Sequence, residues 1–184
     1  RDERDAPLLR YLDSFRYPLA GEFAMTGELA RTVRAQPGWG LEIGSLGEAF
    51  ADTGFAGSAQ VDLGTHEHDH RSVGGPAGLG DMSREVATAL FRALADHGLS
   101  PDFESLRARY REAADRLVDQ YAADAAFNGL TFDAAAEREQ VATYAEAIAP
   151  PGPDRRLPAW QDAPVDPADV LARSRAAIDD ATER

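Results

Sequence analysis

Apolar side chains recur along most of the chain at the spacing of amphipathic helices. Intervals of three and four residues predict helices over about residues 6–15, 27–35, 41–52, 82–96, 101–127, 131–148 and from 167 onward. Residues 58–65 (SAQVDLGT) differ, because Ala59, Val61 and Leu63 alternate with polar residues as in a strand. A single strand needs a partner to pair with. The pattern predicts part of a larger α/β unit, with this segment mostly helical and few strands.

Polar and proline residues mark where these helices begin. Thr26, Asp81, the Ser100-Pro101 pair and the Asp166-Pro167 pair stand at expected N-termini. The glycine-rich run SVGGPAGLG at 72–80 is expected to be a loop.

A proline-rich stretch at 149–165 separates the last helix from the others. We expect it to lie across the core as a strap held by Leu157 and Trp160. The chain then divides into residues 1–98 and a helical extension at 99–184, with a structural or oligomer-forming role for the extension, such as a homodimer.

The charge balance limits the partners. The 184 residues include 32 acidic and 19 basic side chains, and all the basic ones are arginine. A net charge of −13 argues against nucleic acid and anionic membranes as partners. Evenly spread acids without lysine fit a surface adapted to high salt, although codon bias in a GC-rich genome gives the same composition. No apolar run is long enough to span a bilayer, so we expect a soluble, cytoplasmic protein.

Three of the four histidines stand in five residues, at His66, His68 and His70. On a strand they share one face, where imidazoles are suited to a divalent metal. Cysteine is absent, which excludes thiolate ligands. One interpretation is a metal-dependent hydrolase, with Asp62, Asp69 or Asp81 as further ligands. Another is a solvated polar loop.

A second candidate is Glu42, which follows the Gly-Trp-Gly sequence at 38–40. A carboxylate at a helix start gains from the helix dipole, and it is also placed to act as a base. From the residues alone, stabilisation of the first turn is the simpler explanation.

Three motifs in fixed order resemble one family. PLAGEFA (18–24), GWGLEIG (38–44) and AQVDLGTHEH (59–68) resemble P-L-S-G-E-Y-A, G-Y-G-V-E-I-G and A-Q-V-N-L-G with a histidine four residues beyond the glycine. These runs are typical of the C-terminal half of glucosyl-3-phosphoglycerate synthases, which are retaining glycosyltransferases of the GT-A fold. Mannosylglycerate synthases are more distantly similar.

The resemblance implies roles at matching positions. His68 corresponds to a ligand of the catalytic divalent metal, Mn or Mg, and His66 lies on the same side. Glu42 corresponds to a glutamate beside the sugar-receiving group of the acceptor. Trp39 replaces a family tyrosine, Arg71 matches a family arginine, and His70 replaces an asparagine that contacts phosphoglycerate.

The resemblance also implies what lies elsewhere. GT-A enzymes hold the metal and the nucleotide-diphospho-sugar donor with a D-x-D motif, and no two aspartates here are separated by one residue. Residues 1–98 are then the acceptor and metal part of the catalytic domain, and the donor-binding half lies upstream. The implied activity is sugar transfer to a small acidic acceptor such as 3-phosphoglycerate, and the isolated segment is expected to be inactive. A non-catalytic helical interaction domain is the remaining alternative.

Overall fold

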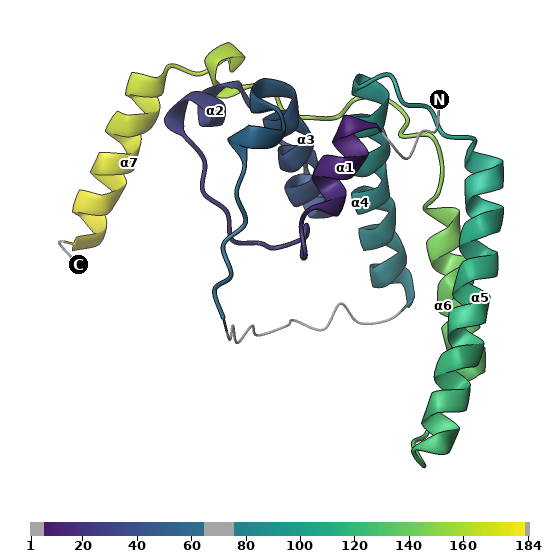
Figure 1. Ribbon diagram of the computed structural model, residues 1–184. Helices are drawn as coiled ribbons and strands as arrows, with labels where there is room; N and C mark the ends of the chain where they lie inside the picture. The colour runs from purple at the N-terminus through teal and green to yellow at the C-terminus, as the bar shows by residue number, and fades with distance from the viewer. Residues whose placement is uncertain (1–5, 65–75, 183–184) are drawn as a thin grey trace.

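The described part of the chain, residues 6–64 and 76–182 of a computed structural model, is built from helices (Figure 1). The α-helices are α1 (Pro7–Asp13), α2 (Gly27–Thr32), α3 (Leu41–Thr53), α4 (Pro76–Asp96), α5 (Phe103–Phe127), α6 (Ala134–Glu146) and α7 (Pro167–Thr182). Short 3-10 turns are η2 (Gly38–Gly40), η3 (Phe55–Gly57) and η4 (Trp160–Asp162). The prediction of a mostly helical segment is confirmed.

The core lies where α1 and α3 meet α4 (Figure 1). Leu8 and Tyr11 of α1 are fully buried in one cluster with Phe91 and Leu94 of α4. The Tyr11 ring lies 5.0 Å from the Phe50 ring of α3, measured between centroids. Burial of these aromatic and aliphatic side chains supplies the main stabilisation of this half of the chain.

Helices α5 and α6 pack on each other as a hairpin that extends away from the core (Figure 1). Val118 and Ala125 are the buried residues of α5. The apolar spacing of the helix expected at 101–127 also predicts that Leu117 and Tyr121 pack, and this is wrong, because both are exposed. The buried residues Val118 and Ala125 instead lie on the neighbouring side of α5.

Several helix boundaries differ from the expected ones. Thr26 caps α2 as expected, since its Oγ1 accepts a hydrogen bond from the Leu29 amide at 3.2 Å. Helix α4 begins at Pro76, inside the expected loop, and Asp81 pairs with a side chain within the helix and is not a cap. Proline suits this start because backbone N–H groups in the first turn of a helix have no partner within the helix, so the N–H that proline lacks is not missed. Asp102, and not the Ser100-Pro101 pair, caps α5.

The strand predicted at 58–65 is wrong for its described residues. Residues 58–64 belong to no helix or strand, and the described ranges contain no β-strand. Val61 and Leu63 are largely exposed. Two hydrogen bonds join this stretch to the N-terminal segment. One links the Tyr11 hydroxyl to Ser58 Oγ at 2.7 Å, and in the other the Arg16 amide donates to Gln60 Oε1 at 2.9 Å. Strand structure needs ladder hydrogen bonds from a partner, and the described residues supply none.

The proline-rich segment crosses the core, but not by the expected contacts. The Leu157 amide donates to the Ala35 carbonyl at 2.9 Å, and Ala159 is buried. Leu157 and Trp160 are 58% and 62% exposed, so the prediction that their side chains hold the strap is wrong. Arg156, described below, anchors it. The boundary between 1–98 and 99–184 stays a prediction.

No helix within 6–64 or 76–182 has the length and apolar character needed to cross a lipid bilayer.

Candidate functional site

The Gly-Trp-Gly turn is fixed against α4 by Glu85. The Trp39 amide donates to Glu85 Oε2 at 2.7 Å. Gly38 has φ of +72°, a region that side chains rarely adopt, and a Cβ there would lie 2.1 Å from the same Oε2. The glycine is therefore required by its conformation, and a side chain there would also push the Glu85 carboxylate away from the Trp39 amide.

Two further glycines let α3 approach α4 closely. A Cβ at Gly40 would lie 2.7 Å from the Ala89 Cβ, and one at Gly47 would lie 2.8 Å from the Ala93 Cβ. Both distances are shorter than real Cβ contacts. Gly40, which directly precedes α3, and Gly47, which lies within it, thus both serve the packing of α3 on α4.

Glu42 and Trp39 lie at this first turn. Glu42 is the acidic residue in the first turn of α3 and is partly buried. Its carboxylate forms no hydrogen bond or ion pair with any other side chain in the described ranges. Trp39, three residues earlier, is 51% exposed. An unengaged carboxylate thus lies three residues after an exposed aromatic side chain, and both residue types are suited to a polar ligand with a sugar-like face.

The remaining predicted site residues lie outside the described residues. His66, His68, His70 and Arg71 fall within 65–75. Their roles therefore stay predictions, and so does our further expectation, from the family correspondence, that Glu42 and His68 face one cleft. Within 6–64 and 76–182, no group of three or more His, Asp or Glu side chains is placed to hold a metal ion.

Two acids considered as additional metal ligands make local contacts. Asp62 Oδ1 accepts a hydrogen bond from the Gly64 amide at 2.8 Å. Asp81 forms an ion pair with Arg84. The fourth histidine, His97, bonds the Ala93 carbonyl through Nδ1 at 2.8 Å and packs against Phe50. These contacts give the hydrolase interpretation no support.

Sequence reasoning missed Glu85 and Arg156. Glu85 holds the turn from 46 residues away, and Arg156 reaches α3 from 108 residues away. Neither belongs to a local motif. The one available signal was the Asp-Arg-Arg run at 154–156, where adjacent cations follow an acid in a strongly acidic chain.

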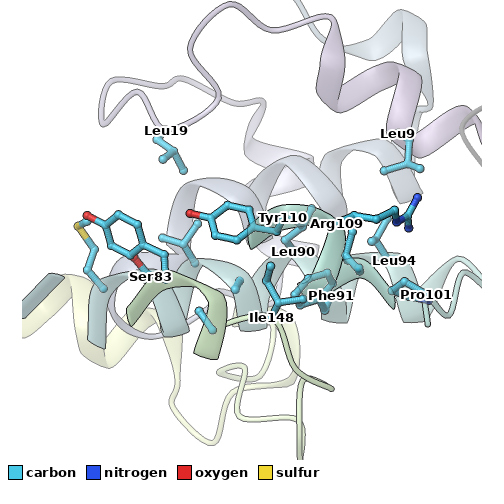
Figure 2. A pocket seen from close by; sticks show the side chains of 16 residues that line it. Leu9, Leu19, Ser83, Leu90, Phe91, Leu94, Pro101, Arg109, Tyr110 and Ile148 are labelled. Carbon is cyan, nitrogen blue, oxygen red and sulfur yellow. The ribbon is translucent and has the colours of Figure 1, made fainter. Parts of the chain in front are cut away.

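An apolar groove of about 830 Å³ lies apart from this turn, among α1, α4, α5 and α6. Figure 2 shows Leu9 and Leu19 on one side, with Leu90, Phe91 and Ile148 on the other. Neither Glu42 nor Trp39 lines it. Its walls are hydrocarbon with few polar groups, so it does not resemble a site for a phosphorylated or nucleotide ligand.

Comparison with known proteins gives one consistent result. A glucosyl-3-phosphoglycerate synthase of Methanococcoides burtonii is 34% identical over 194 aligned residues, covering 100% of this chain and 46% of the relative. One from Persephonella marina is 39% identical over 146 residues, covering 76% of this chain and 36% of the relative. A third, from Mycolicibacterium paratuberculosis, is 46% identical over 84 residues and 45% of this chain.

No protein-family model matches the chain, and no solved structure does. The chain spans less than half the length of the first two relatives. The similarity extends over the whole chain in the Methanococcoides protein, including the strap and α7. The chain is homologous to the C-terminal half of glucosyl-3-phosphoglycerate synthases.

Proposed function

We propose that this chain is the C-terminal part of a retaining glycosyltransferase of the GT-A fold that makes glucosyl-3-phosphoglycerate. The observation that carries the proposal is that the whole of this chain aligns with part of a glucosyl-3-phosphoglycerate synthase. The donor would be a nucleotide-diphospho-glucose bound mainly by an upstream half. The acceptor would be 3-phosphoglycerate, a small anion.

The first turn of α3 supports this assignment. Glu42 is partly buried and unengaged by the described side chains, so its carboxylate is available to orient an acceptor hydroxyl or take its proton. Trp39 presents an aromatic surface beside it, suited to the apolar face of a sugar. The Glu85 bond and the glycine contacts hold both residues on packed helices, which favours a fixed geometry.

We also propose that His68 and His66 would bind a divalent metal, Mn or Mg. The imidazoles of neutral histidines are suitable ligands, and a bound cation would supply charge neutralisation for a leaving diphosphate. His70 and Arg71 would face the anionic acceptor, for which a guanidinium is well suited.

The exposed surface supports operation within a larger protein. Large apolar side chains outside the helices are exposed, including Tyr17, Phe23, Val61 and Leu63. We propose that an upstream part of the protein covers these side chains.

The test is sugar transfer by the full-length protein, using a panel of glucose nucleotides with 3-phosphoglycerate. Wild type should form glucosyl-3-phosphoglycerate, and Glu42→Gln should lower kcat by about 10²–10⁴-fold, the range for loss of a general acid or base. Glu28→Gln is the matched control, because Glu28 is an exposed acid in the first turn of α2. Absence of transfer from every donor would refute the proposed function, and full activity of Glu42→Gln would refute the role of Glu42.

A further inference from the structure

Arg156 lies at the centre of a cluster of charges under the strap. Its side chain is only 6% exposed. The Nη1 atom donates to Glu48 Oε1 of α3 and to Asp96 Oδ2 at the end of α4, both at 2.7 Å. The Nε atom donates to both oxygens of Asp154, at 3.0 and 3.1 Å. One guanidinium therefore joins the strap to two helices of the core.

A second arginine extends the cluster to the segment before the Gly-Trp-Gly turn. Arg34 donates from Nη2 to Glu48 Oε1 at 2.8 Å, and its backbone amide donates to Glu48 Oε2 at 3.2 Å. At the next residue, the Ala35 carbonyl accepts the Leu157 amide at 2.9 Å. Glu48 therefore binds both arginines, and the strap holds residues 34–35 directly.

The electrostatics favour a charged and fixed Arg156. Burial alone would lower the pKa of this guanidinium, but hydrogen bonds to Asp154 and Asp96 outweigh that effect and raise it. The Arg156 guanidinium in turn holds the pKa of Asp154 below its usual range. Arginine suits such a site because its planar fork donates in several directions at once, whereas a lysine ammonium is a single point donor.

The charge cluster contacts both ends of residues 34–48, the stretch that carries Trp39 and Glu42. Residues 34–35 come just before the turn with Trp39, and Glu48 comes two turns after the start of α3 with Glu42. Between these ends, the Gln36 side chain fills the space beside Gly44, with its Cγ 2.5 Å from where a Cβ would lie. Displacement of the strap would therefore remove a support at each end of this stretch and loosen it, while the Trp39–Glu85 hydrogen bond would remain.

We propose that Arg156 is a positioning residue, which holds Glu42 and Trp39 in place through Glu48 and the 34–35 segment. The inference rests on the proposed function where it predicts changes in kcat and KM. Where it predicts a change in hydrogen exchange, it rests only on the geometry of the charge cluster. A misplacement of about 1 Å at a reacting group lowers a rate by about 10²-fold, so a loosened α3 should affect turnover strongly. The donor, bound mainly upstream, should be little affected.

The experiment compares Arg156→Ala, Arg156→Lys and Arg155→Ala in the full-length protein. Arg155 is adjacent, exposed and outside the cluster, which makes it a matched control. We expect Arg156→Ala to lower kcat about 10²-fold and to raise the KM for 3-phosphoglycerate, with the donor KM unchanged. Arg156→Lys should recover only part of the loss. Arg155→Ala should match wild type.

Hydrogen exchange of the same proteins separates positioning from general stability. In Arg156→Ala, amides of 38–44 should exchange at least tenfold faster, while those of α5 keep their wild-type rates. Unchanged kinetics and unchanged exchange at 38–44 would overturn the inference, and so would an equal loss of protection in α5 in both Arg156 variants. If wild type itself transfers no sugar, the proposed function fails, and the exchange rates at 38–44 still decide the positioning role.

Discussion

The close approach of α3 to α4 can be tested at the Gly47–Ala93 contact. Gly47→Ala would place two Cβ atoms 2.8 Å apart, so the helices would have to shift. Ala93→Gly removes the opposing methyl, and the double variant moves that methyl from α4 to α3. The pair forms a cycle in which a second substitution repairs the damage of the first.

The magnitudes follow from three contributions. The overlap in Gly47→Ala costs about 1–3 kcal/mol, and the helix propensity of alanine returns about 1 kcal/mol. Ala93→Gly loses about 1 kcal/mol of propensity and about 0.8 kcal/mol of apolar burial, since Ala93 is buried. In the double variant these contributions cancel. The two single changes should therefore sum to about 2–4 kcal/mol, while the double variant stays close to wild type.

Native-state hydrogen exchange of the α3 amides in the full-length protein measures the relevant opening free energy. Gly44→Ala is the matched control on the same helix, because it meets the Gln36 side chain and not Ala93. Its effect should add to that of Ala93→Gly within about 0.5 kcal/mol. Additivity of Gly47→Ala with Ala93→Gly would refute the claim that this contact sets the helix separation.

Two further outcomes are expected from the charged groups. Because Arg156 holds the pKa of Asp154 below its usual range, the stability contributed by Asp154 is fully present above the ordinary carboxyl pKa of about 3.9 and is lost as the pH falls below it. Melting temperatures should thus fall more steeply below about pH 4 in wild type than in Asp154→Asn, and parallel curves would contradict the pairing. His68→Ala should weaken manganese binding by the full-length protein in a calorimetric titration, with His97→Gln as control; wild-type affinity would exclude His68 as a ligand.

The helices could be predicted from the sequence because apolar residues recur at three- and four-residue intervals, which places them on one face of a helix. Leu8 and Leu94 lie on the expected inner faces and are buried. The conformation of the stretch with Val61 and Leu63 could not be predicted in the same way. Alternating apolar and polar residues favour a strand, but a strand forms only when another strand pairs with it. The start of α4 was misjudged for a related reason, because the glycines that indicated a loop are accommodated within the helix from Pro76 onward.

The candidate site was predictable where it depends on a local motif. Glu42 lies in the first turn of α3, as its position after Gly-Trp-Gly indicated. The supporting side chains were not predictable, because Glu85 and Arg156 act across long sequence separations and resemble ordinary surface charges in the sequence. The same holds for Leu157, whose backbone, and not its apolar side chain, makes the strap contact.

The Arg156–Glu48 ion pair also constrains the order in which the chain acquires its structure. It closes a loop of 108 residues, which costs about 4 kcal/mol of chain entropy. This cost is higher than that of the Asp119–Arg138 ion pair in the α5–α6 hairpin, whose partners are only 19 residues apart in the sequence. Contacts of such long range form late in folding. During synthesis Glu48 and Asp96 emerge long before Arg156 does. Helix α3 can therefore pack on α4 through Gly40 and Gly47 first, and it gains its ion pair with the strap only after residue 156 has emerged.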